Sequence, residues 1–134
     1  LAARNENVSL LKKNYKKKII LIDRFIDSTI AYQHYGMGID LKIIKLLNRF
    51  VLNNIKIDYT FLNIVNKQNL LLRLKKRKNL NRYDKLAYSF YKKVQKGFLI
   101  IAKKKIKKYQ IIDSNQDISL NEKMIINKIE KLIK

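Results

Sequence analysis

The stretch IILIDRFIDSTIAYQHYGMGID, residues 19–40, decides the fold because it places a charged pair and several hydrogen-bonding side chains directly after a wholly apolar run. The apolar run, Ile19–Ile22, predicts a β-strand that is buried on both faces of a parallel sheet. Ligands of open α/β sheets bind just beyond the carboxyl ends of the strands. We therefore expect Asp23 and Arg24 to face a ligand.

The remainder of the chain alternates predicted helices with predicted strands. The patterns predict helices over about residues 2–15, 40–51, 67–76, 84–105 and 119–134, and strands at 17–22, 59–65 and 109–112. Asp40 and Asn66 are expected to cap the helices that follow them, and Ser119 with Glu122 to form a capping box. This alternation predicts an α/β fold, with three strands of a parallel sheet flanked by helices in one domain over residues 1–134.

The composition excludes several kinds of site. The chain has no cysteine and a single histidine, His34, which excludes disulfides, thiolate metal ligands and clustered imidazole ligands. Its three glycines, Gly36, Gly38 and Gly97, cannot build a Gly-rich phosphate-binding loop that ends in Lys and Ser or Thr. No apolar run approaches the roughly 20 residues of a membrane-spanning helix, and no stretch resembles a secretion signal, so we expect a cytoplasmic protein with no membrane partner.

The charge is strongly positive, with 31 Lys and Arg against 10 Asp and Glu, a net charge of +21. A basic surface attracts polyanions by releasing their counterions, which leaves a small RNA-binding protein as an alternative function. Most of the basic residues are lysines in a chain that is also rich in Ile and Asn, a composition typical of A+T-rich coding sequence. We therefore favour solvated lysine faces over a specific nucleic-acid site.

Residues 23–40 closely resemble the nucleoside-binding segment of bacterial thymidylate kinases. That segment begins with DR and an aromatic residue or histidine, continues with S(S/T) and AYQ, and ends in a glycine pair followed by LD or ID. The matching residues here are Asp23, Arg24, Phe25, Ser28, Thr29, Ala31, Tyr32, Gln33, Gly36, Gly38, Ile39 and Asp40. The resemblance implies a C-terminal fragment of such a kinase, lacking the N-terminal region that carries the phosphate loop.

The resemblance also implies a fold and an activity. The fold would be part of the P-loop nucleoside monophosphate kinase fold, with its first strands missing. The parent protein would use Mg²⁺ and transfer the γ-phosphoryl group of ATP to dTMP, giving dTDP. Members of the family are homodimers that pair largely through helices. This chain alone is expected to be inactive, because the missing loop supplies the groups that hold the donor phosphates.

By resemblance, the DR pair carries the catalytic role. Arg24 would hold the acceptor phosphate and Asp23 would orient groups near the metal and the phosphates. From position alone, an ion pair of Arg24 with Asp27 or Asp23 is an equally good interpretation. No residue is assigned with certainty as a metal ligand.

The dTMP site would also include residues on either side of the DR pair. Ser28, Thr29 and Gln33 match residues of the nucleoside site, with Thr29 and Gln33 around the base, and Tyr32 would pack beside the sugar. Helical spacing puts Thr29, Tyr32 and Gln33 on one face, although Tyr32 alone suits a core aromatic equally well. Arg4 matches an arginine that contacts the base.

Residues 73–84, RLKKRKNLNRYD, are expected to form a basic loop. By resemblance this loop is the lid over ATP, with Arg73, Arg77 and Arg82 as lid arginines, the last two also catalytic. A basic run without that context is more often a solvated surface.

The chain departs from the family pattern at Ile57, Asn63, Asn81, Asp84 and Gln95. Three of these changes, at Asn63, Asn81 and Gln95, alter charge near the expected nucleotide. A third hypothesis, beside the kinase and the RNA-binding protein, is an inactive interaction module that is retained after loss of the N-terminal part.

Overall fold

The computed structural model describes residues 8, 10–52, 55–76 and 88–133 of the 134 in the chain. Residues 8 and 10–14 are helical, in agreement with the predicted first helix. The elements that follow are α2 Ile26–Thr29, the π-helix η1 Ile30–Gly36, α3 Leu41–Leu52, β1 Thr60–Ile64, α4 Lys67–Lys76, α5 Tyr88–Lys104, the 3₁₀ turn η2 Ile106–Lys108, β2 Tyr109–Asp113 and α6 Ile118–Ile133.

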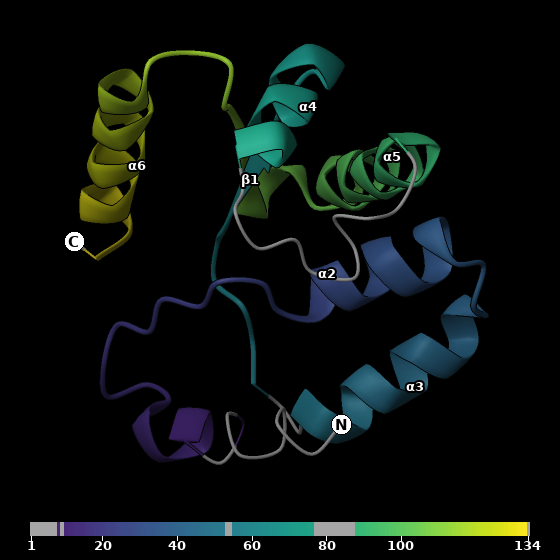
Figure 1. The fold of residues 1–134 in the computed structure, drawn as a ribbon. Helices are drawn as coiled ribbons and strands as arrows, with labels where there is room; N and C mark the ends of the chain where they lie inside the picture. The colour runs from purple at the N-terminus through teal and green to yellow at the C-terminus, as the bar shows by residue number, and fades with distance from the viewer. Residues whose placement is uncertain (1–7, 9, 53–54, 77–87, 134) are drawn as a thin grey trace.

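The centre of the fold is a parallel pair of strands. β1 and β2 run in parallel, with Thr60 opposite Tyr109 and Ile64 opposite Asp113. Parallel neighbours need a long crossover, which here contains α4 and α5. In Figure 1, α5 and α6 lie on opposite sides of β1. The predicted α/β class, with a small parallel sheet flanked by helices, is confirmed.

The strand predicted at residues 17–22 is not present in the structure. Residues 19–22 are extended but not hydrogen-bonded as a strand, and the sheet has two strands. Burial on both faces was also wrong, since Ile19 is 65% exposed and Leu21 is 80% exposed. A strand exists only where a neighbour takes its backbone N–H and C=O groups, and among the described residues no strand is paired with residues 19–22. The apolar run predicts burial but cannot supply that neighbour.

Helix α5 holds the core together. Its buried face includes Val94, Gly97 and Ile101, as the sequence predicts, and it packs against η1, β1 and β2. The contact with η1 is close, because a Cβ on Gly97 would lie 2.5 Å from Cδ2 of Tyr35. Only glycine admits such an approach without displacing the opposite ring.

Two of the three predicted helix caps are confirmed. The backbone N–H of Lys42 donates to Oδ1 of Asp40 at 2.6 Å, and that of Asn69 to Oδ1 of Asn66 at 2.8 Å. The Ser119 capping box is wrong. Ser119 lies inside α6, and its N–H donates to Oδ1 of Asp117 at 2.8 Å, so Asp117 is the cap.

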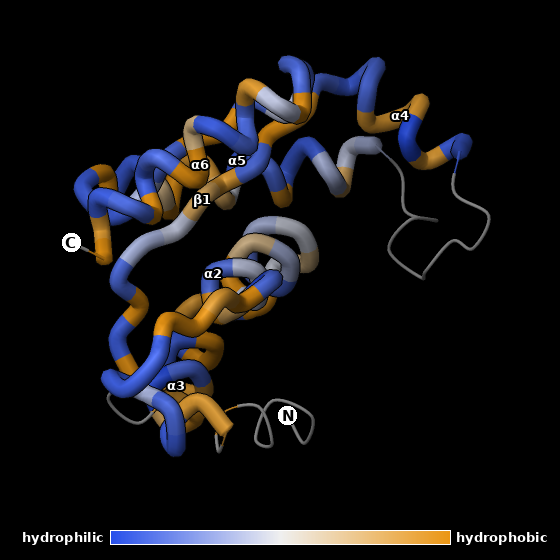
Figure 2. Tube along the Cα trace, turned by 90° about the vertical axis from the view of Figure 1, so that its left-hand side faces the viewer, coloured by the Kyte–Doolittle hydropathy of each residue, from blue (hydrophilic) through white to orange (hydrophobic). Residues whose placement is uncertain are grey.

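The helices mix hydrophobic and hydrophilic positions along their lengths (Figure 2). Such mixing suits helices with one face on the core and one in water. Across the described ranges, no helix combines the length and the apolar character that crossing a membrane requires.

Candidate functional site

The non-helical segment at residues 19–25 borders two clefts. The main cleft, about 2020 Å³, lies between this segment, β1, α5 and the start of β2. The side cleft, about 1030 Å³, lies between the same segment, the end of α2, η1 and α3. Asp23 and Arg24 line both clefts. The residues that follow the apolar run therefore lie at open space large enough for a ligand.

Arg24 adopts a left-handed backbone conformation, with φ of 57°. A non-glycine residue rarely takes this conformation, which costs energy and is concentrated at functional sites. The turn directs the Arg24 side chain over the ring of Tyr32, with the guanidinium carbon 5.4 Å from the ring centroid. The stacking leaves Arg24 exposed to both clefts, where its guanidinium can bind an anion.

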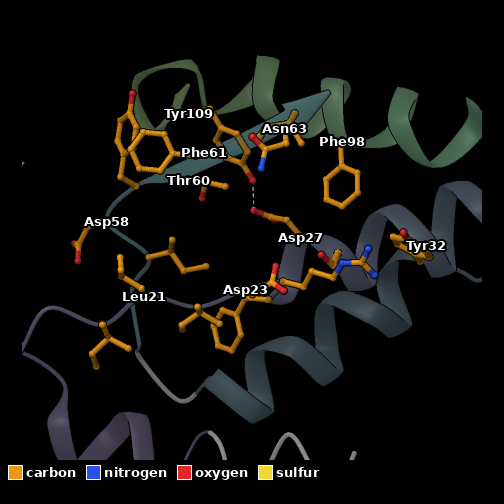
Figure 3. A pocket seen from close by; sticks show the side chains of 18 of the residues that line it. Leu21, Asp23, Asp27, Tyr32, Asp58, Thr60, Phe61, Asn63, Phe98 and Tyr109 are labelled. Carbon is orange, nitrogen blue, oxygen red and sulfur yellow. Dashed lines mark hydrogen bonds between the residues drawn. The ribbon is translucent and has the colours of Figure 1, made fainter. Parts of the chain in front are cut away.

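The next polar group along the chain, Asp27, is buried against β2. It is 8% exposed, and it accepts hydrogen bonds from the Tyr109 hydroxyl and from Nζ of Lys105 at 3.1 Å. Figure 3 shows the side chains of Asp27 and Tyr109 pointing toward one another between α2 and the sheet. Burial, and then Asp27, raise the pKa of Tyr109 above its ordinary value, while a hydrogen bond with Thr60 acts in the opposite direction.

This cluster of Asp27, Lys105 and Tyr109 is not predicted from the sequence. Lys105 and Tyr109 lie 78 and 82 residues after Asp27, and position in the sequence suggests only Arg24 as a partner of Asp27. The structure pairs Asp27 with Lys105. The one signal in the sequence was an acidic residue in a segment that is otherwise apolar or small, which predicts an unusual partner without naming it.

After α2 the chain continues as a π-helix, η1, rather than as an α-helix. Its wider turn is marked by the N–H of Met37, which donates to the carbonyl of Tyr32 at 3.0 Å. Thr29 and Gln33 accordingly line the side cleft, while Tyr32 lines the main cleft. Helical spacing predicts that Thr29, Tyr32 and Gln33 share one face of the helix. In the structure Thr29 and Gln33 line the same cleft, whereas Tyr32 lines the other one.

The other contacts of these side chains differ in kind. Tyr32 packs edge-on against Phe90 and Phe98, with ring centroids 5.9 and 6.3 Å away. Oε1 of Gln33 is buried and has no hydrogen-bond partner within the described residues. Ser28 lines the main cleft. The lack of a partner for the buried Oε1 of Gln33 is costly.

Of the predicted lid arginines, the structure describes Arg73. It lies in the last turn of α4, lines the main cleft, and donates to the carbonyl of Ser114 at 2.6 Å. The predicted basic loop therefore begins as helix. Arg4, Arg77 and Arg82 lie outside the described residues, as do Asn81 and Asp84.

The remaining departures from the family pattern, Ile57, Asn63 and Gln95, all line the main cleft. Oε1 of Gln95 accepts the backbone N–H of Val65 at 3.2 Å, which ties α5 to the chain just after β1. A neutral amide suits this bond because it accepts without adding charge beside the cleft.

The donor set fits a magnesium ion that arrives with a nucleotide. No group of three or more His, Asp or Glu residues that could hold a metal ion occurs in the ranges the structure describes. Three carboxylates of described residues line the main cleft, those of Asp23, Asp27 and Asp58, and Asp23 lines the side cleft as well. Magnesium commonly binds through one or two carboxylates together with substrate phosphates, and this donor set is compatible with such an ion.

Comparison with known proteins identifies close relatives. The family model described as thymidylate kinase matches residues 1–125. A thymidylate kinase from Sulfurihydrogenibium sp. is 37% identical over 113 residues, covering 84% of this chain and 54% of that protein. One from Exiguobacterium sp. is 34% identical, covering 98% of this chain and 63% of that protein.

A crystal structure of thymidylate kinase from Ehrlichia chaffeensis superposes with a TM-score of 0.70 at 31% identity, covering 96% of this chain and 62% of that chain. The chain thus spans between about half and two thirds of the length of these relatives. The comparisons give no support to the RNA-binding alternative. Because the family model matches nearly the whole sequence, the chain belongs to the thymidylate kinase family.

Proposed function

We propose that the protein to which this chain belongs is a cytoplasmic thymidylate kinase, which transfers the γ-phosphoryl group of ATP to dTMP and gives dTDP and ADP. In this reaction a dTMP phosphate oxygen forms a bond to the γ-phosphorus, and the bond from that phosphorus to the oxygen bridging to the β-phosphate breaks. The observation that carries the proposal is the position of Arg24, held in a left-handed turn at the boundary of two clefts and stacked on Tyr32.

Arg24 is proposed to grip the phosphate of dTMP. Phosphoryl transfer depends mainly on positioning and charge neutralisation, and a guanidinium presents a fixed fork of donors to a phosphate. Arg24 is suited to this because its stacking on Tyr32 restricts the side chain before the phosphate arrives. Asp23, next to Arg24, is proposed to orient groups near the phosphates and near the Mg²⁺ that ATP carries. That Mg²⁺ would offset negative charge on the ATP phosphates.

The nucleoside is proposed to occupy the side cleft and the junction between the clefts. Thr29 and Gln33 would lie around the base, Tyr32 beside the sugar, and Ser28 near the phosphate. Arg4 is proposed to contact the base as well.

The main cleft is proposed to receive ATP. Arg73 lines it from α4, and Arg77 and Arg82 are proposed to close over the nucleotide and complete the charge clamp. None of the 134 residues supplies a Gly-rich phosphate loop, so we propose that turnover needs such a segment in addition to this chain. The complete enzyme is proposed to be a homodimer.

The direct test is the binding of dTMP to the purified chain by isothermal titration calorimetry at moderate salt. We expect saturable binding that Arg24→Ala weakens about 10- to 100-fold, the range set by charge-assisted hydrogen bonds of about 1.5–3 kcal/mol. Glu130→Gln, on the exposed side of α6, is the control and should bind as wild type. Binding of RNA with a steep salt dependence, and no preference for dTMP, would instead favour the RNA-binding alternative.

A second test measures turnover. Joining the chain to the N-terminal segment of a relative that carries a phosphate loop should give ATP-dependent conversion of dTMP to dTDP. The same chimera with Arg24→Ala is the control. A well-folded chimera without activity would contradict the kinase assignment and favour an inactive interaction module.

A further inference from the structure

We infer that Asp27 is a positioning residue for the phosphate contact of Arg24, acting through its bonds to Lys105 and Tyr109. The inference rests on the proposed function, because it assigns Asp27 a part in holding Arg24 where the dTMP phosphate binds. It concerns a buried acidic group that neither the proposed chemistry nor the nucleoside contacts use.

The first argument is the geometry of the cluster. Asp27 is the buried residue of α2, and its carboxylate reaches β2 through the Tyr109 hydroxyl and the end of α5 through Nζ of Lys105 at 3.1 Å. Two elements distant in sequence are thereby tied to one side chain. A charged acceptor strengthens both hydrogen bonds in this low-dielectric position.

The second argument is the dependence of α2 on this tie. α2 has only four residues, and its N-cap residue, Phe25, makes no capping hydrogen bond with its side chain. α2 runs without a break into η1, so it is the N-terminal turn of a longer helix. The backbone N–H groups of such a turn have no partner within the helix, and without a side-chain cap the turn depends on tertiary contacts to hold it in place. The contacts of Asp27 therefore set the position of the first turn of α2.

The third argument is that Arg24 lies close to Asp27 along the chain, only three residues before it. Arg24 takes its left-handed conformation, with φ of 57°, immediately before α2 begins. Such a conformation persists only where the surrounding structure enforces it. If α2 were released from β2, the turn at Arg24 would relax. The guanidinium carbon, now 5.4 Å from the centroid of the Tyr32 ring, would then move away from that ring.

Stability alone is a poor reason for this buried carboxylate. Removing a carboxylate from water is costly, and an apolar residue of similar size often stabilises a protein as well or better. The Lys105 side chain is 44% exposed, so its ammonium group can return to water if Asp27 is neutralised. The carboxylate is better explained by what it holds in place.

The experiment compares Asp27→Asn and Tyr109→Phe with two matched controls. Glu130→Gln removes one negative charge from the exposed face of α6. Tyr35→Phe removes a hydroxyl from a tyrosine that packs on the same helix, α5, and lines neither cleft. Each variant is first shown to be folded by circular dichroism and thermal melting.

The first readout separates phosphate contact from folding, because dTMP and thymidine differ only in the phosphate. We expect Asp27→Asn and Tyr109→Phe to weaken dTMP binding about tenfold relative to thymidine binding, a coupling typical of residues in one network. The controls should leave the ratio unchanged. A purely structural role would weaken both ligands equally, and an unchanged ratio in a folded variant overturns the inference.

The second readout needs no ligand. The Nε–H resonance of Arg24, assigned by its loss in Arg24→Lys, should be displaced in wild type by the Tyr32 ring and should return toward the free arginine position in both variants. If wild type binds no dTMP, the proposed function fails while this resonance still decides whether Asp27 positions Arg24. An unmoved resonance overturns the inference. If Asp27→Asn does not fold, Tyr109→Phe, which removes a single oxygen, decides.

Discussion

The guanidinium carbon of Arg24 lies 5.4 Å from the ring centroid of Tyr32, and the two side chains share the main cleft. A guanidinium over an aromatic face is attracted by the ring electrons and loses part of its rotational freedom. The ring is in turn packed edge-on against Phe90 and Phe98. Arg24 is thus supported from α5 although it lies on an exposed turn.

Replacing this ring should weaken dTMP binding. Tyr32→Leu removes the cation–π contact, which is worth about 0.5–1 kcal/mol at an exposed site, so we expect a loss of about two- to fivefold in affinity. Tyr32→Phe keeps the ring and should retain most of the contact. Calorimetric titration with dTMP measures both. Equal losses in the two variants would show that the hydroxyl, and not the ring, matters.

Stability at high pH should depend on Tyr109. Its pKa in the folded chain is raised above the ordinary value of 10.0, first by burial and then by Asp27. The stabilisation associated with this shift is complete below pH 10 and is lost as the pH rises further, because the unfolded chain ionises first.

We therefore expect the free energy of unfolding to fall more steeply with pH above 10 in wild type than in Tyr109→Phe. Urea denaturation between about pH 9 and 11 measures the difference, and the lysines contribute equally to both proteins. Parallel curves would mean that the phenol of Tyr109 titrates normally.

The close contact of α5 with η1 should make Gly97→Ala destabilising. The new Cβ would lie 2.5–2.7 Å from three atoms of Tyr35, including its Cβ, so the backbone must separate. Overpacking of this kind costs about 1–3 kcal/mol. Thermal unfolding measures it, with Lys96→Ala on the exposed side of α5 as the control. A Gly97→Ala melting temperature equal to that of the control would contradict the packing.

The start of α6 should depend on Asp117. Its pKa is lowered, first by the hydrogen bond from the Ser119 hydroxyl and then by backbone N–H groups of the first turn. A lowered pKa gives stabilisation that is present above the ordinary carboxyl pKa and is lost as the pH falls through the lowered value.

Asp117→Ala should therefore lower the helix content and stability at neutral pH, while Asp117→Asn, also a good N-cap, should retain the cap and lose its dependence on acid pH. Circular dichroism during an acid titration records both effects. An Asp117→Asn variant that follows the wild-type titration would exclude Asp117 as the titrating cap.

Local patterns in the sequence predicted the elements that depend on local physics. The caps at Asp40 and Asn66, strand β1, and the buried face of α5 all follow from side-chain periodicity and the needs of helix ends. Ser119 was misassigned because Asp117, two residues earlier, competes for the same N–H groups with a charged oxygen. Serine and aspartate are both good caps, and the pattern alone does not rank them.

Features that depend on distant contacts were not predictable in the same way. The apolar run at residues 19–22 has the composition of a buried strand, but its state depends on a neighbour that no local pattern reveals. Tyr32 lines a different cleft from Thr29 and Gln33, in a π-helix that packs against α5, and the helical spacing of the sequence does not reveal this arrangement. The partners of Asp27 come from residues about 80 positions away.

One edge of β1 is bonded to β2, and among the described residues no strand lies along its other edge. Peptide groups in that position form a template to which a further extended chain can add, and the exposed apolar side chains of Leu21 and Ile22 border the same opening. Self-association of the isolated chain should therefore rise with concentration and with salt, which screens the mutual repulsion of its many lysines. Ligand affinities will therefore be measured on monomers only in dilute solution and at moderate rather than high salt.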